Sequence, residues 1–198
     1  MDIRFSPTRP EAADTLVLAV AKGGLDSLPL AAAPTLSAGA AASRFSGEAG
    51  SSFESFAEEG GRTVRILLLG TGAGGDQDLE KAGGALVAKL ATSGATHAAV
   101  EGLNGEAAAT LAFGARLRSW RFDTYRTRQS EKAKPTLKTI TIVASDADAA
   151  WERQAALADG VAFTRELVAE PANILYPESF VERCRHLEQL GVKITVLD

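Results

Sequence analysis

The sequence is poor in cysteine, in histidine and in long apolar runs, and each shortage excludes a class of protein. The single cysteine, Cys184, cannot form a disulfide within the chain and fits a reducing compartment. The two histidines, His97 and His186, show no His-x-x-x-His spacing and no Cys-x-x-Cys pair occurs, so we expect no structural zinc site. No apolar run approaches the ~20 residues that span a bilayer, and the first residues lack the apolar segment of a signal peptide. We therefore expect a cytoplasmic protein.

An excess of positive charge is also missing. The 198 residues include 21 Lys and Arg against 25 Asp and Glu, which gives a net charge of −4. Nucleic acids and anionic membranes attract basic surfaces, so the overall charge favours neither partner. Hydrophobic residues make up 45% of the chain, which is enough to fill the core of one domain with a short segment to spare.

The apolar pattern predicts strands and helices in alternation. Nearly continuous apolar runs predict strands that are buried on both faces at 15–20 and 63–69. The other expected elements are shorter strands at 3–5, 96–100 and 137–143, a hairpin arm at 53–56, and helices at 36–45, 79–90 and 106–119. A last long helix should run to residue 168, with Asp146 as its N-cap. This order predicts an α/β fold, a three-layer sandwich with a mixed, largely parallel sheet.

Residues 165–177 are interpreted as a joint between two bodies. Pro171 should end a helix near Glu170, because the residue before a proline is pushed out of the helical region. Pro177 suits the first turn of the next helix, where its missing N–H costs nothing. We therefore predict one domain over 1–170 and the beginning of a second over 171–198.

Gly70, Gly72 and Gly75 form a Gly-x-Gly-x-x-Gly turn between an expected strand and an expected helix. In a nucleotide-binding fold, the backbone N–H groups of such a turn face a phosphate, and Glu101 lies near the position of a ribose-binding carboxylate. However, Asp76 and Asp78 open the helix and would repel a phosphate. We prefer a plain glycine turn and keep nucleotide or ADP-ribose binding as an alternative.

Basic and aromatic side chains interleave over residues 116–138, a pattern that can bind single-stranded nucleic acid. We prefer a structural interpretation, in which the aromatics pack under the sheet and the arginines pair with acidic residues or a neighbouring subunit. The residues of this segment are Arg116, Arg118, Trp120, Arg121, Phe122, Tyr125, Arg126, Arg128, Lys132, Lys134 and Lys138.

Carboxylates and serines are plentiful, but none has a neighbouring lysine or histidine that suggests acid–base or nucleophilic catalysis. We therefore assign no catalytic, cofactor-binding or metal-binding residue in this chain. The groups considered are Glu58 with Glu59, Asp146 with Asp148, Glu166 with Glu170, and the serines Ser51, Ser52 and Ser130.

Three segments resemble the leucyl aminopeptidase (cytosol aminopeptidase) family of metallo-exopeptidases. Residues 165–180, RELVAEPANILYPESF, resemble the passage from its N-terminal domain into its catalytic domain. Residues 120–126 resemble its Tyr-Arg-Phe-Asp-x-Tyr-Lys stretch, with Trp120 for the first Tyr and Arg126 for the Lys. Residues 190–198 resemble the first strand of its catalytic domain.

This resemblance implies a macro-domain-like N-terminal domain, followed by the linker, first helix (178–190) and first strand of a truncated catalytic domain. The parent protein would be a cytoplasmic hydrolase that removes N-terminal residues from peptides, using two divalent metals, zinc or manganese, in a homohexamer. Its metal ligands and catalytic residues would lie beyond Asp198, so the chain alone is expected to be inactive. Its partners would be its own catalytic domain and sibling subunits. The alternatives are a free-standing macro-like module that binds ADP-ribose or a nucleotide, and a nucleic-acid-binding subunit.

Overall fold

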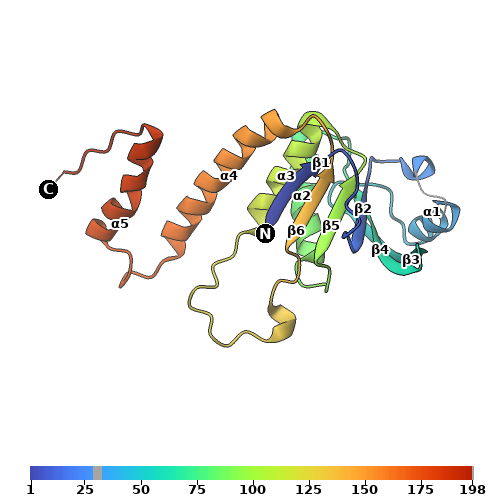
Figure 1. Cartoon of the computed structure of the whole chain (residues 1–198), viewed down its shortest axis with the longest axis horizontal. Coiled ribbons are helices and arrows are strands. Elements are labelled where there is room, and N and C mark those ends of the chain that lie inside the picture. The colour runs from blue at the N-terminus through green and yellow to red at the C-terminus, as the bar shows by residue number, and fades with distance from the viewer. Residues whose placement is uncertain (29–32, 198) are drawn as a thin grey trace. The chain divides into compact units, whose positions relative to one another are not determined.

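The computed structural model describes residues 1–28 and 33–197 (Figure 1). The chain divides into two compact units, Met1–Ala158 and Asp159–Asp198. The long helix α4 (Asp148–Ala169) supplies its first half to the first unit and its second half to the second. The domain boundary after residue 170 stays a prediction.

The first unit is built on one six-stranded sheet with the order β1-β6-β5-β2-β4-β3. Neighbouring strands are parallel except β3 and β4, which form an antiparallel hairpin. The predicted mixed, largely parallel sheet is therefore confirmed. The strands are β1 (Asp2–Ser6), β2 (Thr15–Val20), β3 (Ser52–Glu59), β4 (Arg62–Gly70), β5 (His97–Glu101) and β6 (Thr139–Val143).

Strand β2 shows why the apolar runs form the centre of the sheet. Val17 pairs in register with Leu67 on β4 and with Val100 on β5, and its side chain is fully buried. Leu16 and Leu18 point to the opposite face and are also buried. A strand with apolar side chains on both faces needs cover on both faces, as the sequence predicts.

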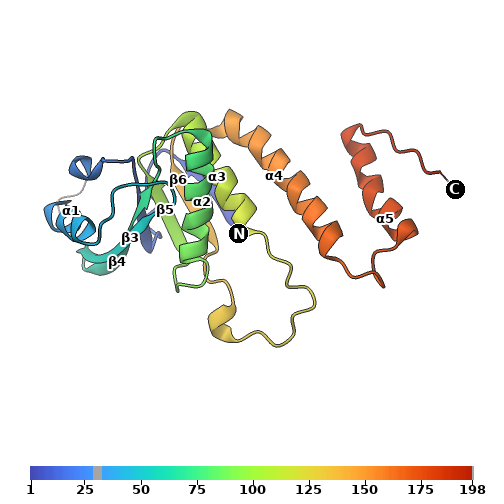
Figure 2. The same ribbon diagram turned by 180° about the vertical axis from the view of Figure 1, so that it is seen from behind.

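Helices cover both faces of the sheet and make three layers. Helices α2 (Asp76–Leu90) and α3 (Gly105–Ser119) lie side by side on one face (Figure 2), where the start of α4 adds Trp151 to the same core. Helix α1 (Ala33–Ala42) packs on the other face over β2 and β4. Short 3₁₀ turns occur at Leu25–Ser27 and Glu131–Ala133. The predicted helices are thus present, with ends that differ by a few residues.

Asp14 ties the start of β2 to the start of β5. Its Oδ2 accepts hydrogen bonds from the Thr96 N–H at 2.8 Å, the Thr96 hydroxyl at 2.5 Å and the His97 N–H at 3.3 Å. Partial burial alone would raise the pKa of Asp14, but the hydrogen bonds from Thr96, Thr15 and His97 outweigh it and lower the pKa below its ordinary value. The carboxylate therefore stabilises the sheet in its charged form.

The prediction that Asp146 caps α4 is wrong. Helix α4 begins at Asp148, and Asp146 Oδ1 instead accepts a hydrogen bond from the N–H of Gly105 at 2.8 Å. Gly105 is the first residue of α3, whose unpaired N–H groups attract a carboxylate just as those of α4 would. The cap therefore serves the neighbouring helix.

In the second unit the two prolines act as predicted. Helix α4 ends at Ala169, and α5 (Pro177–Cys184) begins at Pro177. The expected helix over 178–190 changes after Cys184 to a 3₁₀ helix (Arg185–Leu190). Within this unit Arg183 pairs with Glu170 at 3.1 Å, and the rings of Phe163 and His186 meet edge-on at 4.7 Å.

The expected strand over 190–198 does not form in the described part of that stretch. Residues 192–197 are irregular, and Asp198 lies outside the described residues. The physical reason is that a strand is held by hydrogen bonds to a neighbouring strand. No strand is described in the second unit to provide them.

Candidate functional site

The glycine turn at 70–75 is closed by hydrogen bonds to neighbouring loops. The N–H of Lys22 donates to the Gly72 carbonyl at 2.8 Å, and the N–H of Gly72 donates to the Gly47 carbonyl at 2.9 Å. The N–H of Thr71 donates to Val20 at the end of β2. The backbone groups that a phosphate would need are thus largely used within the protein.

Asp78 completes this closure. Its Oδ2 accepts a hydrogen bond from the N–H of Ala73 at 2.8 Å, so the protein's own carboxylate takes the place of a bound anion at the start of α2. A Cβ on Gly72 would lie only 2.4 Å from the same oxygen. Glu101 lies 3.8 Å from the Arg9 guanidinium. This arrangement explains Gly72 by close packing and gives the nucleotide or ADP-ribose alternative no support.

The basic and aromatic segment is partly neutralised by Asp123. Its carboxylate binds Arg121 at 2.6 Å and lies 3.6 Å from Arg126. The hydrogen bond from Arg121 lowers the pKa of Asp123 below its ordinary value. The expectation that arginines here pair with acidic residues is confirmed for Arg121 and Arg126.

The aromatic side chains do not pack under the sheet as expected. Helix α3 ends at Ser119 and Trp120 has an extended backbone, so the rings lie beyond the helix end. Trp120 stacks on Phe122 at 6.3 Å, and Tyr125 meets Phe122 edge-on at 5.7 Å. The side chain of Tyr125 is half exposed. The aromatic residues therefore support one another in a loop.

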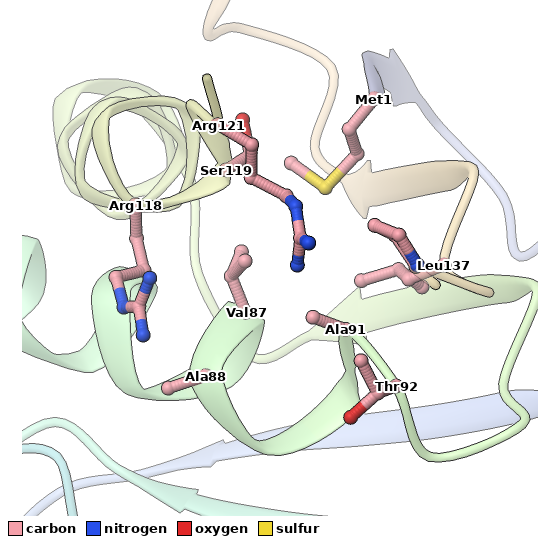
Figure 3. Close-up of a pocket in the computed structure, with 10 residues that line it drawn as sticks. Met1, Val87, Ala88, Ala91, Thr92, Arg118, Ser119, Arg121 and Leu137 are labelled. Carbon is pink, nitrogen blue, oxygen red and sulfur yellow. The ribbon is translucent and has the colours of Figure 1, made fainter. Parts of the chain in front are cut away.

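A pocket of about 350 Å³ lies between the last turns of α2 and α3 and the residues that precede β6 (Figure 3). Its floor is apolar and comes from Val87 on α2 and Ala91 at the C-cap of α2, with Met1 and Leu137 beside them. Val87 and Leu137 are buried. The floor therefore offers a ligand an apolar surface.

The charged side chains of this pocket are both arginines. Figure 3 shows Arg121 reaching over Val87 and Ala91, while Arg118 descends from α3 toward α2 on the Ala88 side. Thr92 and Ser119 also line the pocket, and the Ser119 hydroxyl donates a hydrogen bond to the Arg116 carbonyl at 2.8 Å. Arg116 on α3 donates a hydrogen bond to the carbonyl of Met1, a lining residue, at 3.1 Å and so ties the first residue to α3.

Sequence reasoning named Arg118 and Arg121 as parts of a basic run but missed the pocket. Their spacing places both near the end of one helix, which was visible in the sequence. The apolar floor was not visible, because Met1, Val87 and Leu137 are far apart along the chain. Only the packing of α2, α3 and β6 brings them together.

Both histidines have structural partners, in agreement with the sequence interpretation. Nε2 of His97 lies 2.9 Å from the Thr141 hydroxyl on the neighbouring strand, and Nδ1 of His186 lies 2.7 Å from the Arg183 carbonyl. Within 1–28 and 33–197, no three His, Cys, Asp or Glu side chains gather as a metal site would require. No helix in these ranges is long and apolar enough to cross a membrane.

Several of the carboxylates and serines considered in the sequence have local partners. Glu59 pairs with Arg9, and the Ser51 hydroxyl donates to the Glu48 carbonyl at 2.6 Å. Glu166 and Glu170 both face Arg183. These contacts are structural, and the geometry suggests no acid–base pair among them.

Comparison with known proteins gives consistent matches. The profile of the "Cytosol aminopeptidase family, N-terminal domain" matches residues 17–129. The probable cytosol aminopeptidase of Caulobacter vibrioides is 38% identical over 211 aligned positions, which cover 100% of this chain and 43% of the relative. That of Gluconobacter oxydans is 37% identical and covers 98% of this chain and 41% of the relative.

Solved structures agree at the level of the fold. A mutant of tomato leucine aminopeptidase superposes with a TM-score of 0.74 at 23% identity, over 96% of this chain and 42% of that one. The bottromycin maturation enzyme BotP in complex with Mn gives 0.69 at 23% identity, over 91% and 37%. The chain thus spans less than half the length of these relatives. It belongs to the cytosol aminopeptidase family, of which it carries the N-terminal domain.

Proposed function

We propose that this chain is the non-catalytic N-terminal domain of an aminopeptidase whose complete form removes N-terminal residues from peptides. The observation that carries the proposal is the profile match at 17–129, together with full-length relatives that are more than twice as long. The Pro171 to Pro177 joint, which resembles the passage into a catalytic domain, supports a second domain after it. The boundary near residue 170 is part of this proposal.

The residues described here do not fit a two-metal centre, since no three metal-binding side chains gather among them. We place the two divalent ions, zinc or manganese, on residues outside this chain. When bound, such ions activate a water molecule and polarise the scissile carbonyl. This chain would contribute no group to that step.

The role proposed for this domain is assembly and shielding of the catalytic domain within a cytoplasmic homohexamer. Two features of the second unit support a partner there. Phe180 on α5 is 46% exposed and Leu190 is 76% exposed, which leaves apolar surface for a following domain to cover. The macro-like character of the first unit stays an expectation from the family resemblance.

The test is to purify the native protein from its source cells with an antibody against residues 1–158. We expect a species more than twice the 20.6 kDa of this chain that hydrolyses leucine p-nitroanilide and loses this activity in EDTA. Isolated 1–198 serves as the inactive control. A native product of 20.6 kDa, or a heavier one without metal-dependent peptidase activity, would contradict the proposal.

A further inference from the structure

The pocket between α2 and α3 has the composition of a ligand site for a small anion. Buried apolar side chains, Val87 and Leu137, form its floor, and Arg118 and Arg121 line it without any acidic residue. Ligand pockets of about 300–1,000 Å³ typically combine an apolar lining with a few polar groups that orient the ligand. This pocket, at about 350 Å³, lies at the small end of that range.

The positive charge of the pocket is not cancelled by its surroundings. Asp123 binds Arg121 and also faces Arg126, so one carboxylate is shared by two guanidinium groups. Among the described residues Arg118 makes no ion pair. The three arginines and one aspartate leave an excess of positive charge, of which Arg118 is the unpaired part.

A second cavity of about 330 Å³ shows the contrast. It is lined by Arg9 and Arg62, but Arg9 pairs with Glu59, which also lines the cavity. Arg62 donates to the carbonyl of Glu11, another lining residue. The lining thus carries two acidic residues, Glu11 and Glu59, against its two arginines, so the cavity offers an anion no excess of positive charge.

We propose that the Arg118 pocket binds a small amphipathic carboxylate, with its head neutralised by Arg118 and Arg121 and its apolar body lying over Val87, Ala91 and Leu137. A singly charged head suits the site better than a phosphate, because Asp123 already satisfies part of Arg121. The volume equals that of roughly a dozen waters, which limits the ligand to about a dozen non-hydrogen atoms. The inference concerns this chain alone and is independent of the proposed peptidase activity.

Two sources share this chemistry: a short peptide or acyl amino acid with an apolar carboxyl-terminal residue, and a medium-chain fatty acid. N-acetyl-L-leucine represents the first and octanoate the second. The first source also carries an amide, and Ser119 and Thr92 are the uncharged polar residues of the lining. Whichever probe binds more tightly identifies the source, and binding of either one supports the proposal.

The experiment measures thermal unfolding and isothermal titration of 1–198 with each probe. Ligands of this size reach dissociation constants of ~1 mM, so 10 mM of a probe should raise the Tm of the chain by about 3–5 °C. The neutral N-acetyl-L-leucinamide should bind at least ~10-fold more weakly, because it cannot form the charge-assisted hydrogen bonds.

Three variants separate the pocket from general charge effects. Arg118→Ala removes the unpaired cation, and Ala88→Leu fills the pocket from an exposed helical position without changing charge. Both substitutions should weaken binding of the carboxylate probe by at least ~10-fold. Arg128→Ala removes one exposed arginine that does not line the pocket and should leave binding unchanged. The proposal would be overturned if the unsubstituted chain bound neither carboxylate probe, if the neutral amide bound as tightly as the carboxylate, or if Arg118→Ala bound the carboxylate as tightly as the unsubstituted chain.

Discussion

Helices α2 and α3 cross so closely that one added methyl group should force them apart. A Cβ at Gly83 would lie 2.0 Å from the Leu111 carbonyl oxygen, and one at Gly114 would lie 2.0 Å from the Glu80 carbonyl oxygen. Both obstructing atoms belong to the backbone of the facing helix. No side-chain rotation can relieve such a contact, so the Gly83→Ala substitution must displace a helix.

The size of the effect follows from this displacement. Lengthening the contact from 2.0 Å to even 3.0 Å moves the helices by about 1 Å. A gap of that size forfeits a quarter to a half of the dispersion energy between the facing side chains. Overpacking typically costs about 1–3 kcal/mol, and we expect the upper end because only backbone can move. The better helix propensity of alanine returns about 1 kcal/mol, which leaves a net loss of about 2 kcal/mol.

Gly84 provides a matched control on the same helix. A Cβ there would meet its nearest atom, the Cβ of Arg118, at 3.9 Å, which is an ordinary contact. Gly84→Ala should therefore stabilise the chain by up to about 1 kcal/mol through helix propensity alone. The two substitutions change the same atoms in the unfolded chain, so their difference of about 3 kcal/mol isolates the helix crossing.

The assay is thermal unfolding followed by tryptophan fluorescence, since Trp120 and Trp151 both belong to the first unit. Each kcal/mol of change in the free energy of unfolding shifts Tm by about 2–4 °C. Gly83→Ala should therefore melt about 4–8 °C below the unsubstituted chain, and Gly84→Ala up to about 4 °C above it. If Gly83→Ala melts at or above Gly84→Ala, the close crossing of α2 and α3 is wrong.

Three further substitutions test single interactions. Asp14→Asn should cost about 1–2 kcal/mol at pH 7 by removing a charged acceptor. The pKa of Asp14 is lower in the folded than in the unfolded chain, so its charge stabilises the fold fully at pH values above the unfolded pKa. This stabilisation is lost as pH falls through the folded pKa. The free energies of unfolding of the unsubstituted chain and Asp14→Asn, measured with denaturant, should therefore become equal in acid. Glu54→Gln should lower the free energy of unfolding by about 0.5–1 kcal/mol, because Glu54 binds Lys89 at 2.9 Å. Salt screens this ion pair, so the loss should be smaller in 1 M NaCl, and urea unfolding with and without the salt measures the difference. Gln154→Met should be neutral or slightly stabilising in the same assay, since the buried Oε1 of Gln154 has no hydrogen-bond partner among the described residues.

The first two substitutions have a control variant each, and the third has a result that would contradict it. Asp26→Asn changes an exposed aspartate and should leave the acid limb of the stability curve unchanged. Glu58 is exposed and lies on the same strand as Glu54. The change in the free energy of unfolding caused by Glu58→Gln should depend little on salt. A clear loss of stability in Gln154→Met would mean that its hydrogen bond to Thr110, at 3.2 Å, outweighs the unsatisfied oxygen.

Local sequence was enough to predict most elements of the fold. The apolar runs at 15–20 and 63–69 became β2 and β4, because a strand without polar side chains must be covered on both faces. Pro171 and Pro177 fixed the break between α4 and α5, because a proline restricts the backbone of its immediate neighbours. The motif at 165–180 indicated the family on the same local basis.

The errors arose where a local signal had more than one possible partner. Asp146 has the character of a helix cap, but the sequence does not say which of two nearby helix ends it serves, and it caps α3. Residues 190–197 have the composition of a strand, yet a strand depends on hydrogen bonds from another strand. Trp120, Phe122 and Tyr125 found apolar contacts in one another instead of in the sheet.

The sequence by itself thus determined the order of strands and helices, the helix break at residues 171–177 and the family, because each of these depends on residues that are close together in the chain. Only the tertiary structure decided that Gly83 meets Leu111, that Asp14 accepts hydrogen bonds from Thr96, and that Arg118 lines a pocket with an apolar floor. These contacts join residues that are far apart in the chain, and they depend on which faces meet and at what distance. Periodicity identifies an apolar face but does not specify its partner.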